Sequence, residues 1–439
     1  MTGLKTVILD KISRCEAVVG VIGLGYVGLP LAVEMAEAGY RTIGFDVQRK
    51  KVDAVNAGQN YIGDIVGNTL KEVVEEGKLS ATSDFGFIRD VDAVLICVPT
   101  PLDQYQQPDI SYVKNSTESV ARRLHRGMLV VLESTTYPGT TEELLKPILE
   151  SSGLRCGEDF YLAFSPERVD PGNKTYRTKN TPKVVGGVGQ EATAVAAALY
   201  RNVLSGGVYE VSSPAVAEME KLLENTYRTI NIGLANEMAI ICNRMGINVW
   251  EVIDAAKTKP YGFQAFYPGP GLGGHCIPLD PFYLTWKARE YDYHTRLIET
   301  SGEINTAMPE YVVDRAMKVL NKNRTAMNGA RVLVLGVAYK ADIDDCRESP
   351  ALHVLEHLER EGALVSYYDP YIPEVRHKGR IYRGEAALTD ELLQSADIAI
   401  ICTAHAAFDY ERIQRLSKEV FDTRNAMRDV KDRSNIELL

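Results

Sequence analysis

Short apolar runs alternate with stretches of helical periodicity along the first half of the chain. Segments such as Leu29–Ala38 and Ser111–Arg122 repeat their apolar residues at helical spacing. The apolar runs between these segments have the length of strands, and they are Val18–Ile22, Thr42–Phe45, Ala93–Val98, Leu129–Glu133 and Lys183–Gly186. Strands that alternate with helices predict a parallel sheet wrapped by helices.

Beyond Pro214 the pattern changes to that of a long helix. From Ala215 to about Met245 the chain contains only one turn signal, the isolated Gly233. After a glycine-rich loop and a further helical stretch, a second alternating unit begins with "RVLVLGVAYK" and continues with "LVSYYDP" and "DIAIICTAH". The predicted fold class is α/β, with two doubly wound domains joined by a long central helix. The predicted domains are residues 1–212, 213–320 and 321–439.

Composition and charge narrow the class of protein. A chain of 439 residues is too long for one compact domain. Its net charge of −10, its pI near 5.4 and the lack of a basic block argue against a nucleic-acid partner. The amino terminus lacks a signal pattern, and no uninterrupted apolar run reaches transmembrane length. The seven cysteines are scattered without metal-type or disulfide spacing, so we expect no metal site, no membrane association and a cytoplasmic location.

The sequence "VIGLGYVGLP" places Gly23, Gly25 and Gly28 between a predicted strand and a predicted helix. In such a motif the first glycine permits a tight turn, the second lets the backbone approach a pyrophosphate, and the third lets the helix pack closely. The helix amino terminus then presents unpaired N–H groups to the phosphates. We therefore predict a dinucleotide-binding loop that includes Tyr26 and Val27.

Asp46 ends the next predicted strand, about twenty residues after the glycines, as in dinucleotide-binding folds. A carboxylate here accepts hydrogen bonds from the adenosine ribose and repels a 2′-phosphate, which favours NAD over NADP. The bases Arg49, Lys50 and Lys51 follow and leave NADP open, although they would also suit a solvated turn. We expect Lys51 to lie beside the cofactor.

Two further loops should border the same site, because ligands bind outside the carboxyl ends of parallel strands. Thr100 follows "LICVP" and Thr135 follows "VVLES". We predict that both contact the cofactor, Thr135 at its nicotinamide end, unless its hydroxyl only satisfies a turn. Thr140 or Thr141 could cap the helix that follows.

The predicted long helix carries a polar stripe. Lys221, Asn225 and Arg228 are spaced to share one face, which would line a cleft if it is not simply a surface stripe. Glu167 lies in the proline- and glycine-rich loop "FSPERVDPG", where a carboxylate is ordinarily just solvated. Asp280 precedes Pro281 in the arrangement of a helix N-cap with a first-turn proline.

The loop "YPGPGLGGHCIPLDP" surrounds Cys276 with glycines and prolines. Glycines allow a ligand or another backbone to approach closely, and prolines restrict the backbone. The alternative is a tight surface loop with a cysteine that has no special role.

Seven motifs together resemble the nucleotide-sugar 6-dehydrogenases, which include the UDP-glucose and UDP-N-acetylhexosamine dehydrogenases. The motifs cover nearly the whole chain in the family's order. They are "GLGYVGLPLA", "VPTP", "ESTTYPGTTEE", "SPERVDPGN", "EMEKLLENTYRTINIGLANE", "GPGLGGHCIPLDP" and "GVAYKADIDDCRESPAL". The resemblance implies two Rossmann-like domains joined by a long helix, with NAD in the first and the UDP part of the substrate in the last. It also implies oxidation of the sugar C6 alcohol to a carboxylate, with two NAD reduced per sugar.

The resemblance also implies the catalytic residues. Cys276 stands at the position of the nucleophile, whose thiolate adds to the C6 aldehyde to give a thiohemiacetal and then a thioester. Lys221 matches the lysine that stabilises oxyanion charge. Asn225 matches an asparagine that binds water and the oxyanion, Asp280 a carboxylate that activates water, and Glu167 a glutamate of proton transfer.

Substrate positions follow from the same resemblance. Lys340 matches a substrate-binding lysine, Arg347 an arginine that reaches the cofactor, and Tyr267 lies in the sugar-binding segment. Without the resemblance, Lys340 and Arg347 would be read as part of a charged surface turn. Glu167, Lys221 and Asn225 should also contact the sugar nucleotide, and so should Arg168 and Gly273.

The residues around Cys276 favour one branch of the family. The sequence "HCIPLDP" is similar to the N-acetylhexosamine branch, most of all to bacterial UDP-N-acetylglucosamine 6-dehydrogenases that serve O-antigen and other surface polysaccharides. UDP-N-acetylmannosamine, UDP-N-acetylgalactosamine and UDP-glucose remain alternatives. A two-electron hydroxyacid or 6-phosphogluconate-type dehydrogenase and a non-catalytic nucleotide sensor are the alternatives from other classes. The apolar face of the long helix suggests a homodimer or a higher homo-oligomer.

Overall fold

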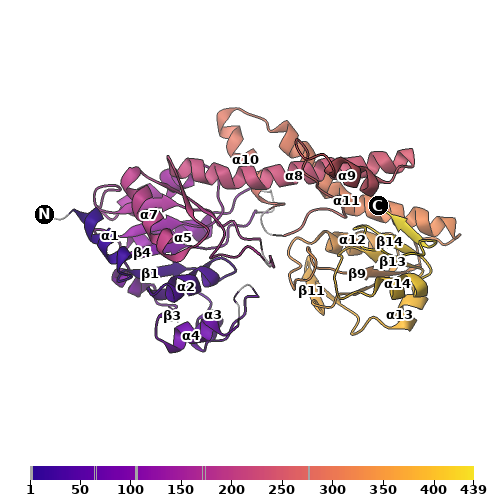
Figure 1. Ribbon diagram of the computed structural model, residues 1–439, viewed down its shortest axis with the longest axis horizontal. Helices are drawn as coiled ribbons and strands as arrows, with labels where there is room; N and C mark the ends of the chain where they lie inside the picture. The colour runs from indigo at the N-terminus through magenta and orange to yellow at the C-terminus, as the bar shows by residue number, and fades with distance from the viewer. Residues whose placement is uncertain are drawn as a thin grey trace. The chain divides into compact units, whose positions relative to one another are not determined.

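The computed structural model describes residues 3–63, 65, 67–103, 107–170, 172–173, 175–274 and 277–439. The chain divides into two compact units. Unit 1 comprises Met1–Glu224 and Phe282–Asp292, and unit 2 comprises Asn225–Pro281 and Tyr293–Leu439. Figure 1 labels their helices and strands.

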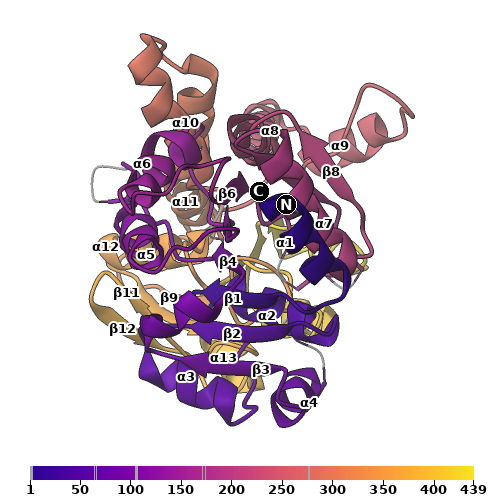
Figure 2. The same ribbon diagram turned by 90° about the vertical axis from the view of Figure 1, so that its left-hand side faces the viewer.

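Unit 1 is built on an eight-stranded sheet of order β3-β2-β1-β4-β5-β6-β7-β8, in which only the β6–β7 pair is antiparallel. Figure 2 shows β4, β1, β2 and β3 following one another across the sheet. The strands are β1 Val18–Ile22, β2 Arg41–Phe45, β3 Leu79–Thr82, β4 Ala93–Ile96, β5 Leu129–Leu132, β6 Tyr161–Phe164, β7 Lys183–Gly187 and β8 Val208–Val211.

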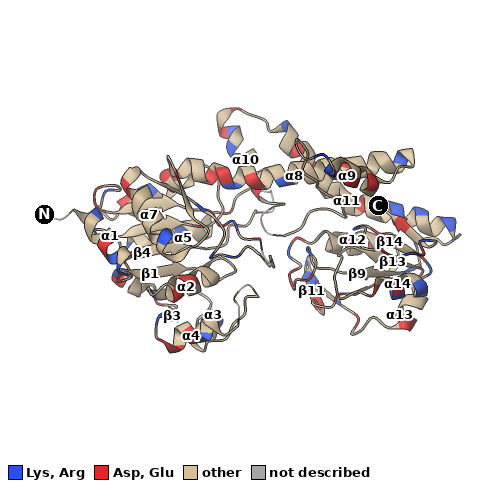
Figure 3. Ribbon diagram, in the orientation of Figure 1, with Lys and Arg blue, Asp and Glu red and all other residues tan. Residues whose placement is uncertain are grey.

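Helices precede, connect or follow these strands. In the first part of the chain they are α1 Leu4–Ser13, α2 Gly28–Glu37, α3 Arg49–Asn56, α4 Thr69–Glu75, η1 Phe85–Asp90, α5 Ser111–Ala121, the π-helical turn η2 Thr141–Leu145, α6 Lys146–Glu150 and α7 Gln190–Val203. The long helix α8 runs from Pro214 to Met245, and acidic residues follow one another along its N-terminal part (Figure 3). Next come α9 Val249–Lys257, α10 Asp280–Ala288, η3 Arg289–Tyr291 and α11 Arg296–Lys322.

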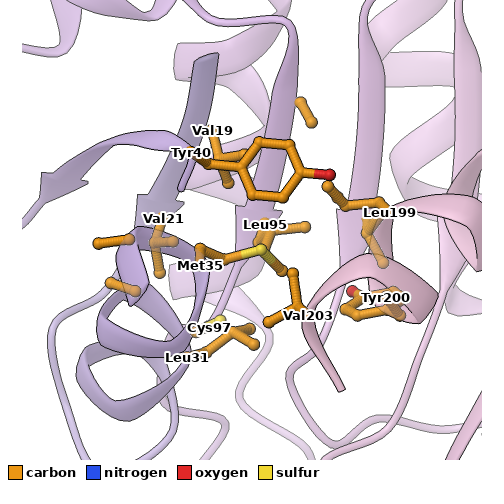
Figure 4. Packing of buried hydrophobic residues seen from close by; sticks show 14 of the residues in the cluster. Val19, Val21, Leu31, Met35, Tyr40, Leu95, Cys97, Leu199, Tyr200 and Val203 are labelled. Atoms are coloured by element: carbon orange, nitrogen blue, oxygen red, sulfur yellow. The ribbon is translucent and has the colours of Figure 1, made fainter. Parts of the chain in front are cut away.

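The sheet of unit 1 is buried on both faces. Val19 and Val21 of β1 belong to one hydrophobic cluster with residues of α2 and α7, whereas Ile22 belongs to a second cluster. Figure 4 shows Met35 of α2 and Leu199 of α7 in the first cluster, together with residues of β1 and β4. Because successive strand residues point to opposite faces, two clusters on one sheet mean helices on both sides.

Unit 2 contains a five-stranded parallel sheet of order β10-β9-β13-β14-β15 and a separate antiparallel hairpin, β11–β12. The strands are β9 Arg331–Leu335, β10 Leu364–Tyr368, β11 Glu374–His377, β12 Arg380–Arg383, β13 Ile398–Ile401, β14 Val420–Asp422 and β15 Ile436–Leu438. The helices are α12 Pro350–Arg360, α13 Asp390–Ser395 and α14 Tyr410–Leu416. Helices α11 and α12 share a buried cluster with β9 and β13.

The predicted fold class is confirmed, because two α/β sheets of doubly wound type lie on either side of α8 in the chain. The three predicted domain ranges stay a prediction. Among the described residues, none of the helices combines the length and apolarity that a membrane span requires.

Candidate active site

The glycine loop after β1 has the geometry that a dinucleotide requires. Gly23 adopts a positive φ of 95°, and a side chain there would meet the carbonyl oxygen of Cys97 at 2.5 Å. A side chain on Gly28 would meet the carbonyl oxygen of Gly23 at 1.8 Å, so only glycine lets α2 begin this close to the sheet. Gly25 faces open space, with no atom within 4 Å of the position that a Cβ would occupy. The backbone at Gly25 is therefore accessible to a pyrophosphate, as the motif predicts.

Asp46 lies at the end of β2 and holds this loop. Its Oδ2 accepts a hydrogen bond from the Leu24 N–H at 2.9 Å, and its Oδ1 accepts one from the Gln48 N–H at 2.8 Å. The Lys51 ammonium lies 3.4 Å from Oδ2. A buried carboxylate fixed in this way presents negative charge beside the loop, which suits a ribose diol and opposes a phosphate. Lys51 pairs with that carboxylate, so its charge is partly neutralised.

Replacing Asp46 with serine should relax discrimination against NADP. Removal of the carboxylate abolishes a like-charge repulsion worth several kcal/mol, so the preference for NAD should fall by about tenfold or more. Steady-state kcat/KM values with both cofactors measure the ratio. The matched control is Asp53→Ser, which removes an exposed carboxylate from α3. An unchanged ratio in Asp46→Ser would remove Asp46 from the ribose site.

Thr100 and Thr135 follow β4 and β5, the two strands that come after β1 in the order of the sheet. The Thr100 carbonyl accepts a hydrogen bond from the Tyr283 hydroxyl at 2.7 Å. Ser134, next to the half-buried Thr135, donates to the Val98 carbonyl at 2.7 Å. Both threonines thus lie in loops at the carboxyl edge that carries the glycine motif, and their contacts with the cofactor stay a prediction, as do those of Tyr26 and Val27.

The loop after β5 is held by a buried glutamate of α8 that sequence reasoning missed. The Glu218 carboxylate accepts hydrogen bonds from the Gly139 N–H at 2.6 Å and from the Thr141 N–H and hydroxyl at 2.9 and 2.6 Å. The Thr140 hydroxyl donates to the Tyr137 carbonyl. Thr140 stands at the N-cap position of η2, as expected, but neither hydroxyl caps the helix, because that of Thr140 bonds within the loop and that of Thr141 bonds to Glu218.

Glu167 and Lys221 lie together in unit 1. The Lys221 ammonium donates to the backbone carbonyl of Glu167 at 2.5 Å, and Lys221 is only 7% exposed. The Glu167 carboxylate accepts hydrogen bonds from the N–H groups of Arg168 and Val169, each at 2.8 Å. These bonds hold the Glu167 carboxylate and the Lys221 ammonium in defined positions, which acid–base chemistry requires.

A buried ion pair between Lys183 and Glu133 lies next to Glu167. Lys183 at the start of β7 bonds to Glu133, which also accepts a hydrogen bond from the Tyr200 hydroxyl. The Lys183 ammonium lies 3.9 Å from Glu167 Oε2. Burial opposes the charged form of Lys183, but Glu133 and Glu167 outweigh it and raise the pKa of the ammonium. The sequence signal that could have revealed this pair is a lysine at the start of an apolar strand, because the whole strand, Lys183 included, is buried.

Arg168 ties the same loop to α8. Its guanidinium binds the carboxylate of Glu224, with an Nε–Oε2 distance of 3.2 Å, and its Nε lies 3.4 Å from Glu220 Oε1. Burial, together with the neighbouring Glu224, raises the pKa of Glu220 to about 7. Arg168 is therefore fixed between two carboxylates, and its predicted contact with substrate stays a prediction.

The pKa of Glu220 predicts a measurable pH dependence of stability. The folded state binds this proton more tightly than the unfolded chain does, where the pKa is near 4.5. The stabilisation is therefore complete below pH 4.5 and lost as the pH rises through about 7. Glu220→Gln should remove this loss, so the variant should unfold at a higher temperature than the parent at pH 8. Thermal unfolding across this pH range measures it, with the exposed Glu237→Gln on α8 as control; parallel curves for parent and variant would refute it.

Asn225 and Asp280 form a buried pair in unit 2. The Asn225 side-chain amide donates to Asp280 Oδ2, and the two residues are 5% and 2% exposed. Asp280 begins α10, as the N-cap pattern indicated to within one residue. One turn further along α8, the Thr229 hydroxyl donates to the Ile277 carbonyl at 2.9 Å. The amide and hydroxyl of α8 thus hold both ends of the segment 277–280.

Arg228 differs in burial from Lys221 and Asn225, the other two members of the predicted polar stripe. It is exposed, whereas Thr229 is 3% exposed. The spacing still places Lys221, Asn225 and Arg228 on one face of α8, but only the first two are buried, so the lining of a cleft by this stripe stays a prediction.

Cys276 lies outside the described residues, but the glycines that lead to it are described. A side chain on Gly273 would meet Cβ of Tyr339 at 2.6 Å and the carbonyl oxygen of Glu348 at 3.0 Å. The Gly274 N–H donates to the Arg347 carbonyl at 3.1 Å. These glycines therefore admit another part of the backbone of unit 2. A contact between Gly273 and substrate stays a prediction.

The other predicted substrate residues lie elsewhere in unit 2. Lys340 is half-buried in the loop after β9. The guanidinium of Arg347 forms an ion pair with Asp345, with an Nη2–Oδ2 distance of 2.6 Å. Tyr267 stacks on Trp250 of α9 with ring centroids 5.9 Å apart. Their roles stay predictions.

Comparison with known proteins finds matches along most of the chain. Three models of the UDP-glucose/GDP-mannose dehydrogenase family match it in order: the NAD-binding domain at residues 17–204, the central domain at 215–307 and the UDP-binding domain at 333–431. The chain is 40% identical over 356 residues to a UDP-N-acetyl-D-glucosamine 6-dehydrogenase of Pseudomonas aeruginosa, which covers 81% of this chain and 83% of that protein. It is 36% identical over 417 residues to a UDP-N-acetyl-D-mannosamine dehydrogenase of Pyrococcus horikoshii, which covers 94% and 96%. A solved structure of a UDP-D-ManNAc dehydrogenase from Pyrococcus horikoshii has a TM-score of 0.87 at 35% identity and covers 96% of this chain and 98% of that one.

The first sheet with its glycine loop and Asp46 defines an NAD-binding α/β dehydrogenase, and the residues present fit that cofactor. The UDP-binding domain match adds a nucleotide-sugar substrate. The chain belongs to the UDP-glucose/GDP-mannose dehydrogenase family, as an NAD-dependent UDP-sugar 6-dehydrogenase. The alternatives of a hydroxyacid dehydrogenase and of a non-catalytic sensor are thereby set aside.

Proposed function

We propose that the enzyme oxidises UDP-N-acetylglucosamine at C6 to the uronic acid through a covalent adduct on Cys276. The buried Asn225–Asp280 pair carries this proposal, because it fixes a carboxylate four positions after Cys276 in the chain. A carboxylate oriented by an amide is suited to activate the water that cleaves a thioester. NAD, when bound, supplies hydride acceptance, and two molecules are consumed per sugar.

The residues of this chain supply the remaining chemistry. The Cys276 thiolate adds to the C6 aldehyde, and the carbon–sulfur bond holds the aldehyde as a thiohemiacetal whose oxidation leaves a thioester. The Lys221 ammonium stabilises negative charge on the C6 oxygen, because it is fixed by the Glu167 carbonyl before reaction begins. Asp280 and Glu167 accept protons from the attacking water; one proton passes on to the departing Cys276 thiolate, which restores the free thiol, and the other is released as the product ionises to the carboxylate.

The other cysteines whose pKa is shifted are poor candidates for the nucleophile. Burial raises the pKa of Cys156 to about 11 and of Cys402 to about 12. Burial also raises the pKa of Cys97 and Cys346. A thiol with a raised pKa holds little thiolate at neutral pH, which supports the assignment of Cys276.

The choice of sugar rests on the residues around Cys276 and on the relatives. Ile277 and Leu279 follow the pattern of the N-acetylhexosamine branch. Relatives from Pseudomonas aeruginosa and Salmonella typhi are named UDP-N-acetyl-D-glucosamine 6-dehydrogenases, and others are named UDP-N-acetyl-D-mannosamine dehydrogenases. We place the reaction in the cytoplasm, where reducing conditions keep the thiol free, and in the supply of uronic acids for surface polysaccharide.

The decisive experiment incubates the enzyme with NAD and a panel of UDP-N-acetylglucosamine, its manno and galacto epimers, and UDP-glucose. We expect the highest kcat/KM with UDP-N-acetylglucosamine, two NADH per sugar and a product with the mass of the acid. A higher kcat/KM for another sugar would replace the substrate. One NADH per sugar with an aldehyde product would overturn the covalent mechanism.

We further propose that the enzyme is a homodimer or a larger homo-oligomer that covers the exposed apolar side chains of α8. Those side chains are Val216, Met219, Leu223, Tyr227, Leu234, Ile241 and Met245. An apolar stripe of this length along a helix is typical of an interface. Light scattering of the full chain, which gives its mass in solution, tests the proposal, and a monomer would refute it.

A further inference from the structure

Two histidines and a glutamate gather on one side of unit 2, outside the residues assigned above. His353 and Glu356 lie one turn apart on α12, and His377 ends strand β11. One ligand atom from each residue lies within 4.8 Å of the other two. The distance from Glu356 Oε2 is 3.4 Å to His377 Nε2 and 3.8 Å to His353 Nδ1. Among the described residues this is a group of potential metal ligands drawn from two elements, and the NAD and UDP-sugar chemistry does not use it.

These spacings are close to those of a coordinated ion. Zinc binds imidazole nitrogen and carboxylate oxygen at about 2.0–2.2 Å, so tetrahedral ligand atoms lie about 3.4 Å apart. The separation between Glu356 and His377 already has this value, and the separation of 3.8 Å between Glu356 and His353 is close to it. The side chains are 38%, 26% and 15% exposed for His353, Glu356 and His377, so an ion can enter and keep a water as its fourth ligand.

The backbone holds the three residues in place before any ion binds. Spacing of i and i+3 puts His353 and Glu356 on one face of α12. His377 lies at the tight turn of the β11–β12 hairpin, where Lys378 adopts a positive φ of 47°. The two imidazole rings meet edge to face with centroids 5.0 Å apart. Preorganised ligands lose little conformational entropy on binding, which favours affinity.

Two cations compete with a metal ion for the carboxylate. The Lys378 ammonium lies 3.0 and 2.8 Å from the two oxygens of Glu356, and Arg360 lies 3.6 Å from Oε1. Lys378 is 61% exposed, so its flexible side chain can move into solvent when an ion arrives. The lysine should therefore lower metal affinity without blocking the site. In a metal site, removal of Lys378 should strengthen metal binding, whereas in a simple ion-pair cluster Lys378 is an essential member.

We propose that His353, Glu356 and His377 bind one divalent first-row transition-metal ion, with Zn²⁺ the best fit, contrary to the expectation from the cysteine pattern that the chain has no metal site. Two imidazoles and one carboxylate suit Zn²⁺, Co²⁺ and Ni²⁺, whereas Mg²⁺ and Ca²⁺ require oxygen ligands. The ion would join the β11–β12 hairpin to α12. Because α12 begins at Pro350, next to the loop that carries Arg347, the ion would stabilise this part of the UDP-binding unit.

The test uses the full chain after treatment with a chelator. Calorimetric titration with Zn²⁺ should show one site that His353→Asn and His377→Asn each weaken by at least about tenfold, since each removes a ligand. Lys378→Ala should strengthen binding. His357→Asn, on the same helix but outside the group, should leave affinity unchanged, and Mg²⁺ should not bind. Co²⁺ absorption distinguishes nitrogen and oxygen ligands from cysteine thiolates, because thiolates give intense near-ultraviolet charge-transfer bands.

Two results would overturn the proposal. One is Zn²⁺ binding that both histidine variants retain at parental affinity, which would place the ion elsewhere. The other is the absence of saturable Zn²⁺ binding in both the parent protein and Lys378→Ala. Circular dichroism and NADH formation from UDP-sugar check that every variant is folded.

Discussion

Cys276→Ser should stop the enzyme before acid is released. Serine adds to the aldehyde poorly, and an ester on it would be hydrolysed slowly, so acid formation should fall by about three orders of magnitude or more. We expect at most one NADH per sugar, or a single burst that leaves an ester-like adduct on the protein. Stopped-flow measurement of NADH and intact-protein mass spectrometry separate these outcomes.

The control for this experiment is Cys346→Ser. Cys346 is a half-buried thiol of the same unit, and burial raises its pKa, so its loss should leave turnover near the parental value. Acid release at the parental rate by Cys276→Ser would contradict the nucleophile assignment, whatever the substrate sugar proves to be.

Lys221→Met should lower kcat by about 10²–10³ with a smaller effect on KM, which is the cost of removing one fixed group that stabilises developing negative charge. The ammonium is buried and held by the Glu167 carbonyl, so neither water nor a mobile side chain can replace it. Methionine fills a similar volume without charge or donors. Pre-steady-state NADH formation shows whether the hydride-transfer step itself is slowed.

Arg228→Met is the matched control, because it removes an exposed cation from the same helix. Equal losses in Lys221→Met and Arg228→Met would indicate a general electrostatic effect of α8. A large rise in KM with kcat unchanged in Lys221→Met would show that the lysine only binds substrate.

The fold was predictable because most strands are continuous apolar runs. The strands β1, β2, β4, β5 and β7 begin and end within two residues of their predicted limits. The edge strand β3 escaped prediction because its sequence, "LSAT", lacks an apolar run. Edge positions need less hydrophobic burial, so the pattern that identifies central strands is weaker there.

The part of the site whose residues lie close together in the sequence was predictable. Gly23, Gly25 and Gly28 follow one another in a single turn, so their roles could be read from spacing alone. The support of Glu167 by Lys183 and Glu133 could not, because Glu133 and Lys183 lie 50 residues apart and only the sheet brings them together. The role of Gly273 was also hidden, because the atoms it must avoid belong to Tyr339 and Glu348.

The close packing of Gly273 on Tyr339 brings two segments of unit 2 that are predicted to contact the substrate side by side. Lys340 follows Tyr339 directly, and the glycine loop leads directly to Cys276. If Lys340 binds the sugar nucleotide, as the resemblance implies, the substrate contact and the glycines that precede Cys276 belong to one packed part of unit 2. We therefore expect the enzyme to select substrates by the length of their phosphate bridge. A sugar nucleotide with a longer or shorter bridge should bind and yet remain unoxidised, because its C6 would not reach the thiol.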